Sequence, residues 1–185
     1  MFTNNYTKYR KMKFWNEQTS FVDCIGNSVT GCTGEYNHCG EIGVAIKNAY
    51  CREMVNHQIN SYTQASCLPG VYFGSGSTPA TVDDYKLEHL ITTGLTITNP
   101  EEIVEQNEND DYYFTSYFIL ENTTDATINI YEIGLFGEVL KYDKTLYHHA
   151  ILFRRDVLGE PISIAPGEVK RIAYKLVYHQ VLNVE

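Results

Sequence analysis

The cysteines are the residues of this chain whose chemistry most readily suggests metal binding. Five occur among the 185 residues, at Cys24, Cys32, Cys39, Cys51 and Cys67. Two histidines, His38 and His57, lie among them. Structural zinc sites usually draw on Cys-x(2–4)-Cys pairs, and no two of these cysteines are that close. The odd number also argues against a complete disulfide framework. We therefore expect free, mostly buried thiols and assign no metal ligand, with a zinc site as the alternative.

Acidic side chains and histidines are the next candidates, because paired carboxylates can cleave a glycosidic bond. The acids considered are Glu101, Glu102, Glu132 and Glu138. No spacing selects two of them, and acidic residues are common on solvated surfaces. His148-His149 could supply a base or a ligand, but adjacent residues of a strand face opposite sides. Without a nucleophile–base set, we predict that the protein is not an enzyme and holds no cofactor.

The glycine-rich stretch from Gly70 to Glu88 suggests phosphate binding at first sight. Its Gly-x-Gly lacks the third glycine of the dinucleotide fingerprint, since Pro79 follows, and the Gly-Lys pair of a P-loop is also absent. We interpret the stretch as a strand, a glycine-hinged loop and one short helical turn entered at Thr78-Pro79. The rest of the chain is organised around it.

The elements that position these residues are mostly strands. Tyr112 to Glu121 alternates apolar and aromatic residues on two faces, as a strand does. Asn122 to Ala126 is rich in turn formers, and Thr127 to Ile133 returns, so we predict an antiparallel hairpin. Asn99-Pro100 is expected to break the strand that comes before it.

The last third of the chain continues this pattern. Ala150 to Phe153 predicts a short apolar strand that ends at Arg154 and Arg155. Ala165 to Glu168 has proline before glycine, as a type II turn requires, and a final strand follows. We predict a mainly β fold, an antiparallel β-sandwich of jelly-roll or immunoglobulin-like type with little helix. Residues 1–66 form a loop-rich N-terminal arm and region that docks on neighbours, and residues 67–185 form the sandwich domain.

Charge is unevenly distributed along the chain. The net charge of −9 argues against a direct role in binding nucleic acid. No lysine or arginine occurs from Leu87 to Leu140, whereas the start of the chain is basic. One interpretation is a solvated acidic face. The other is an interface in which the arm of one copy meets the acidic flank of the next; its residues are Lys8, Arg10, Lys11, Lys13, Trp15, Glu101, Glu102, Asp110 and Asp111.

Four stretches together resemble a known group of proteins. They are Gly74–Glu88, then Tyr131–Phe136 after the turn at Asn122, then Ile151–Leu158 with Ile162–Glu168, and finally Ile172–Leu176. In this order and spacing they resemble virion proteins of tailed bacteriophages, namely tail, neck or fibre-attachment components. The likeness covers about residues 70–180 and does not extend to the first 65 residues.

The resemblance implies β-sandwich subunits that assemble into rings or sleeves, with no catalytic residues to carry over. The expected partners are copies of the chain in a ring or trimer and other virion structural proteins. The start of the chain has no apolar signal segment and no run is long enough for a membrane helix, so we expect synthesis in a bacterial host cytoplasm and a final place in the virion, without a membrane partner. The alternatives are a receptor- or glycan-binding fibre module, whose tyrosines would stack on sugars, and a carbohydrate-active enzyme.

Overall fold

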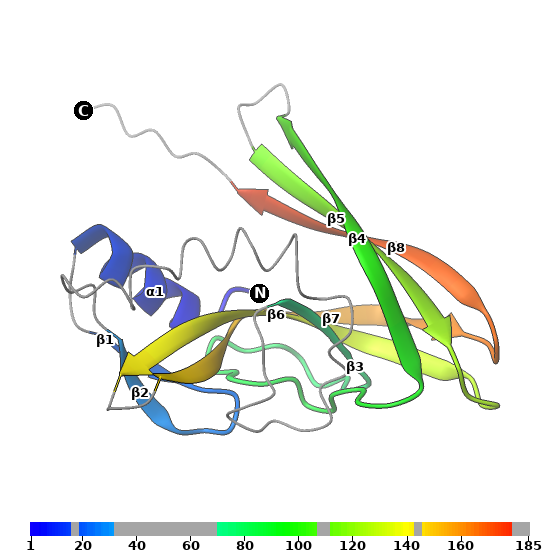
Figure 1. The fold of residues 1–185 in the computed structure, drawn as a ribbon, viewed down its shortest axis with the longest axis horizontal. Helices are drawn as coiled ribbons and strands as arrows, with labels where there is room; N and C mark the ends of the chain where they lie inside the picture. The colour runs from blue at the N-terminus through cyan, green and yellow to red at the C-terminus, as the bar shows by residue number, and fades with distance from the viewer. Residues whose placement is uncertain (16–18, 32–69, 107–111, 143–145, 179–185) are drawn as a thin grey trace.

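The structure is a computed structural model that describes residues 1–15, 19–31, 70–106, 112–142 and 146–178 (Figure 1). Within these ranges the elements are α1 (Asn4–Trp15), β1 (Thr19–Val22), β2 (Ser28–Gly31), β3 (Gly70–Gly74), β4 (Leu95–Gln106), β5 (Tyr112–Asn122), β6 (Ile128–Tyr142), β7 (Leu146–Ile164) and β8 (Val169–Tyr178). The described chain is therefore mainly β, as the alternating sequence predicts, with one short helix.

The described strands form antiparallel sheets, and none of these sheets closes into a barrel. Their orders are β3-β6-β7, β4-β5-β8 and β1-β2. The predicted hairpin of Tyr112–Glu121 with Thr127–Ile133 is wrong, because β5 and β6 belong to different sheets. Both edges of β5 are occupied, by β4 and by β8, so the chain after Asn122 crosses to the other sheet and pairs there with β3 and β7.

Two strands run further than the sequence predicts. β7 continues through Arg154 and Arg155, because both side chains have acidic partners that compensate their charge within the sheet. β4 continues through Asn99-Pro100 with a register shift between Thr98 and Glu101. Proline is tolerated there because β4 is an edge strand, where one side of the backbone needs no ladder hydrogen bond.

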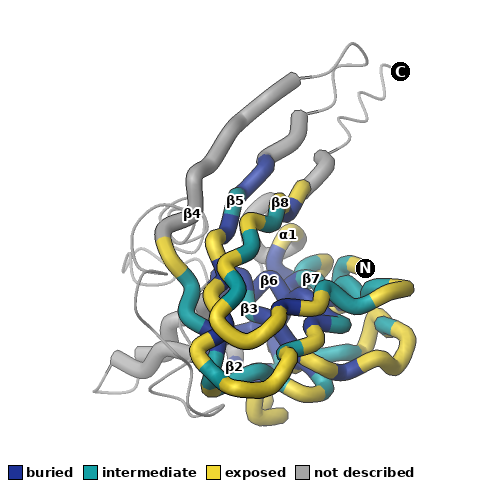
Figure 2. The backbone as a smooth tube through the Cα atoms, turned by 90° about the vertical axis from the view of Figure 1, so that its right-hand side faces the viewer, coloured by how far each residue is buried: buried dark blue, intermediate teal, exposed yellow. Residues whose placement is uncertain are grey.

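The two three-stranded sheets share one hydrophobic core. Its buried members come from both sheets and are Val71, Phe73, Leu95, Phe118, Leu120, Ile130, Ile133, Leu135, Ile164 and Tyr174. The buried positions gather in the middle of the molecule (Figure 2). The sheets are joined where β5 leads to β6 and where β7 leads to β8, and they diverge towards the far ends of β4 and β8 (Figure 1). Burial of this apolar surface is what holds the sheets together.

The start of the chain packs onto β7. Phe2 forms an antiparallel bridge with Arg154, and the Thr3 N–H donates to the Phe153 carbonyl at 2.9 Å. Tyr6 and Tyr9 of α1 contact the Phe153 ring. Residues 1–3 thus cover part of the edge of β7 with which no described strand pairs, which protects that edge from pairing with other chains.

Candidate functional site

A buried carboxylate on β6 fastens the glycine-rich loop that connects β3 and β4. Glu132 is fully buried. Its Oε1 accepts hydrogen bonds from the backbone N–H of Gly76 at 3.1 Å and of His89 at 2.8 Å. Its Oε2 accepts one from the Glu88 N–H at 3.0 Å. One side chain therefore satisfies three backbone donors at both ends of the loop, which a buried carboxylate needs in order to remain in the interior.

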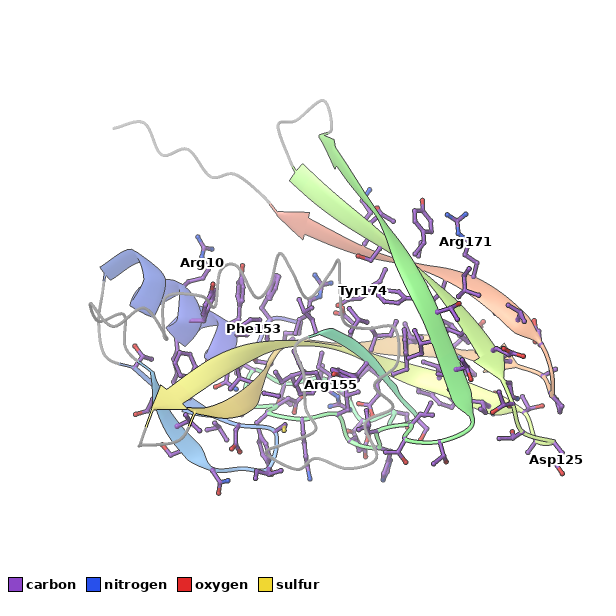
Figure 3. The ribbon with its side chains drawn as sticks, viewed as in Figure 1. Arg10, Asp125, Phe153, Arg155, Arg171 and Tyr174 are labelled. Atoms are coloured by element: carbon purple, nitrogen blue, oxygen red, sulfur yellow. The ribbon has the colours of Figure 1, made fainter. Side chains whose placement is uncertain are left out.

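Arg155 on β7 supplies the opposite charge. The register aligns Glu132 with Val157 and Gly134 with Arg155, so Glu132 and Arg155 are diagonal neighbours on one face of the sheet. Arg155 Nε donates to Glu132 Oε2 at 2.7 Å, and the arginine is only 3% exposed. Figure 3 shows Arg155 in the middle of the molecule beside β6 and β7. Because Arg155 is almost fully buried, it requires a close anionic partner.

The far end of the guanidinium holds the loop itself. Arg155 Nη1 donates to Asp84 Oδ2 at 2.9 Å, and Nη2 lies 3.5 Å from Glu88 Oε2 and 3.4 Å from Thr78 Oγ1. Three carboxylates, those of Asp84, Glu88 and Glu132, therefore surround one arginine. We call these five residues, Thr78, Asp84, Glu88, Glu132 and Arg155, the charge cluster.

The predicted helical turn at Thr78-Pro79 does not form. The Thr78 hydroxyl and N–H both donate to Glu88 Oε2, at 2.9 and 3.0 Å, instead of capping a helix. A single turn forms later, where Asp84 N–H donates to the Thr81 carbonyl at 3.3 Å and the Asp84 carboxylate accepts from Thr81 in return. Hydrogen bonds to the side chains of Glu88 and Asp84 thus replace those that a helical turn at Thr78-Pro79 would have made.

The glycines of this loop are required by close packing. A Cβ on Gly76 would lie 2.6 Å from Glu88 Oε2 and 2.7 Å from Glu132 Oε1, both closer than side chains approach. The Gly76 N–H, which a phosphate would need as a donor, already donates to Glu132 Oε1, and the missing side chain of Gly76 lets the backbone approach the charge cluster closely.

The electrostatics of the cluster are those of a fixed ion-pair network. Burial alone would raise the pKa of Asp84, but hydrogen bonds from Thr81 and Arg155 lower it below its usual value. The Thr78 N–H lowers the pKa of Glu88. Burial would lower the pKa of Arg155, and its bonds to Asp84 and Glu132 raise it instead. A general acid at neutral pH needs a raised carboxyl pKa, so Asp84 and Glu88 are suited to holding the loop, not to donating protons.

A second polar contact links β7 to β8 across the two sheets. Asp156 accepts hydrogen bonds from Arg154 Nε and from the Tyr174 hydroxyl, each at 2.7 Å. The α-amino group of Met1 lies 2.7 Å from the same carboxylate. Burial alone would raise the pKa of Asp156, but hydrogen bonds from these three donors outweigh it and leave the pKa below its usual value. Tyr174 therefore reaches from the shared core to the polar residues of the first sheet.

Asn122 holds the end where the sheets are joined. It is fully buried, and its Nδ2 donates to the carbonyls of Ala126 at 2.7 Å and Ile164 at 2.9 Å. Its Oδ1 accepts from the N–H and hydroxyl of Thr124. Sequence reasoning identified Asn122 only as a turn former. Its role in joining the two sheets depends on Ile164, which lies 42 residues later.

An open groove of about 560 Å³ borders the cluster. Ser77, Pro79, Tyr131, Asp156 and Leu158 are among the residues that line it. It combines one aromatic ring with hydroxyl and carboxylate groups, a combination that can bind a polar ring such as a sugar.

The predicted interface residues lie on separate elements. Lys8, partly buried, and Arg10, exposed, are on α1, and Lys11, Lys13 and Trp15 belong to the same helix. The helix packs against β1 and β7 (Figure 1). Glu101 and Glu102 lie in β4 of the other sheet, opposite Tyr117 and Ser116. Asp110 and Asp111 lie outside the described residues. The structure therefore does not bring the basic and acidic sets together within one chain.

The metal and membrane hypotheses are addressed only for the described part of the chain. Cys24 is buried, in agreement with the expectation for it, and the other four cysteines lie outside the described ranges. Among the described residues, no group of three or more His, Cys, Asp or Glu side chains is arranged to hold a metal ion. None of the described helices has the length and apolar character that crossing a bilayer requires.

Comparison with known proteins adds no relative: no family model matches the chain, and no curated protein or solved structure shows significant similarity to it.

Proposed function

We propose that this protein is a structural component of a tailed-bacteriophage virion, in the tail, neck or baseplate region. The observation that carries the proposal is that the four stretches behind the sequence resemblance meet in space. The charge cluster joins the first three stretches, through Glu88, Glu132 and Arg155. Asp156, next in the chain, accepts the hydrogen bond of Tyr174 from the fourth.

The proximity of the four stretches supports the resemblance, because it shows that they belong to one structural unit. Each stretch alone is an ordinary sequence for a β protein, but here the first three share the charge cluster and the fourth contacts Asp156, the residue next to Arg155. The two sheets around a common core support the finer fold proposal, an antiparallel sandwich of jelly-roll or immunoglobulin-like type. The partners that follow are further copies in a ring or trimer and other virion structural proteins, after synthesis in the host cytoplasm.

The test is whether the protein is built into particles. Phage particles from the source that encodes the chain are purified on a density gradient, and their proteins are quantified by mass spectrometry. We expect the chain in a fixed copy number per particle, with gold-labelled antibodies bound at the tail or neck in electron micrographs. Recovery of the chain only in the particle-free fraction would overturn the proposal.

The groove beside Tyr131 favours one second candidate, a glycan-binding module of a fibre. Its test is retention on a panel of immobilised host-surface glycans, with Tyr131→Ala as the variant that removes the stacking ring. Retention of the wild type that Tyr131→Ala abolishes would favour this candidate. Equal behaviour of the two proteins would dismiss the groove as a binding site. The carbohydrate-active enzyme gains no such observation from the described residues.

A further inference from the structure

The β4-β5-β8 sheet has an acidic edge. β4 is one outer strand, and no described strand pairs with its outer side. Its sequence, LTITNPEEIVEQ, contains three glutamates and no basic residue. All three, Glu101, Glu102 and Glu105, follow the register shift at Thr98/Glu101 and lie in the six residues Glu101–Gln106, which keep an uninterrupted ladder with β5.

The opposite edge of the same sheet is basic. β8 is the other outer strand, and among the described strands only β5 pairs with it. Its sequence, VKRIAYKLVY, contains three basic residues and no acid. They are Lys170, Arg171 and Lys175, of which Arg171 and Lys175 are exposed. Figure 3 shows Arg171 projecting from the outer side of the sheet and Tyr174 projecting from the inner side.

The two edges are compatible in direction. β4 and β8 are each antiparallel to β5, so they run parallel to each other at opposite sides of one sheet. A second copy placed beside the first, in the same orientation, would bring its β8 alongside the first copy's β4. The two strands would then form a parallel pair with evenly spaced backbone hydrogen bonds. Strand addition of this kind is a common way for an open edge to bind another chain.

We propose that copies of this chain associate head to tail, with the basic β8 edge of one copy added to the acidic β4 edge of the next. This inference rests on the proposed function, and it names the surface through which the subunits would assemble. The charges select the pairing: β4 against β4 would oppose acids, and β8 against β8 would oppose bases. A contact between two different edges repeats from copy to copy, so it closes into a ring or continues as a filament.

The bulge at Asn99-Pro100 limits the contact to one end of β4. Pro100 has no N–H to donate and the ladder is interrupted beside it. The part of β4 that offers an uninterrupted edge is Glu101–Gln106, at the end where the sheet diverges from the rest of the molecule (Figure 1). A neighbour's strand can approach there without meeting the β3-β6-β7 sheet.

The test reverses each edge separately. Glu101→Lys/Glu105→Lys makes both edges basic, and Arg171→Glu/Lys175→Glu makes both acidic. We expect the wild type to form a multimer in light scattering, and each double variant to associate at least about tenfold more weakly. An equimolar mixture of the two variants should associate again, because each basic edge then meets an acidic one. Asp125→Lys and Lys86→Glu each reverse one charge, half the change of the corresponding double variant, at exposed positions on connecting segments and should keep the wild-type mass.

Circular dichroism melting shows whether each variant folds. The salt dependence of association is a second test, and it uses the wild type alone. Association of the wild type should weaken as NaCl rises from about 0.05 M to about 0.5 M, since salt screens exposed charges. Variants that associate as the wild type does, a mixture that stays monomeric, a wild type that is monomeric at every concentration, or salt-independent association would each overturn the inference. The particle test of the proposed function is separate. If the chain is found in particles but the two edges do not associate, this inference fails and the proposed function stands.

Discussion

Glu132 and Arg155 form a nearly solvent-free ion pair, with Nε 2.7 Å from Oε2 and exposures of 0% and 3%. The pair lies on adjacent strands, but its function is to hold a loop: Glu132 binds backbone donors at both ends of residues 75–89, and Arg155 binds Asp84 within it. Loss of either partner therefore leaves a buried charge and also releases the loop.

The losses of stability caused by removing the two members of this pair should not add. Glu132→Gln and Arg155→Met should each lower the free energy of unfolding by about 3–5 kcal/mol, since each leaves a buried charge without its main partner. The double variant should lose clearly less than the sum, as measured by urea unfolding of all four proteins. The control Glu121→Gln, at an exposed position of β5, should change the free energy of unfolding by less than about 0.5 kcal/mol. Strictly additive losses would show that the pair is not coupled.

Adding one methyl group at Gly76 should destabilise the protein, whereas the same addition at Gly159 should not. Gly76→Ala places a Cβ against Glu88 and Glu132 and should cost about 1–3 kcal/mol, because the carboxylates must move from their donors. Gly159→Ala is the matched control, since a Cβ there meets no atom within 4 Å. Thermal unfolding of the two variants decides the matter, and equal melting temperatures would contradict the close approach.

Asn122, at the end of β5, should contribute more to the stability of the protein than a turn residue usually does. Asn122→Ala removes both donors to the Ala126 and Ile164 carbonyls and should lower the free energy of unfolding by about 2–4 kcal/mol. Asn129→Ala, the same change at an exposed site with one side-chain partner, Ser163, should cost less than about 1 kcal/mol. Chemical unfolding curves measure both. An Asn122→Ala loss no greater than that of Asn129→Ala would refute its role in joining the sheets.

Asp156 should make stability depend on acid pH. Its pKa is lower in the folded than in the unfolded chain, so the unfolded chain binds more protons in this range. The stabilisation is complete above the unfolded-state pKa of about 3.9 and is lost as the pH falls towards the folded value. Asp156→Asn should be about 1–3 kcal/mol less stable at pH 7 and should lose less on acidification. Urea midpoints at neutral and acid pH test this.

The matched control for acidification is Asp125→Asn, at an exposed position between β5 and β6 that Figure 3 labels far from Asp156's partner Tyr174. It should leave the pH profile of the wild type unchanged. If Asp156→Asn shows the same acid dependence as the wild type, other groups account for it.

Local patterns predicted the strands well and the pairings poorly. The alternation of Tyr112–Glu121 placed Phe118 and Leu120 on one face and Ile119 on the other, and in the structure the first two are buried and Ile119 is exposed. The positive φ of Gly167 confirms the glycine-dependent turn. The hairpin failed because strand pairing depends on which edges are already occupied, and a short connection such as Asn122–Ala126 suits a hairpin and a crossing between sheets equally well.

The charge cluster was beyond sequence reasoning for a different reason. Glu132 was weighed as one of four possible catalytic carboxylates or as a surface acid, and Arg155 only as the end of a strand. Their partners are 44 and 71 residues away, at Glu88 and Asp84, and no local spacing encodes such distances. The available signal was the concentration of glycine and acid in residues 74–88, which indicated an ordered loop without indicating what held it.

The contact between the first residues and β7 sets the order in which the chain can fold. The Thr3 hydroxyl donates to the Leu152 carbonyl at 2.6 Å, and Phe2 bridges to Arg154. On a ribosome that adds about 5–20 residues per second, the start of the chain waits roughly 8–30 s for this partner strand to be made. Residues 1–3 are therefore already made when β7 appears and can cover its edge from then on, although contacts so distant in sequence slow folding.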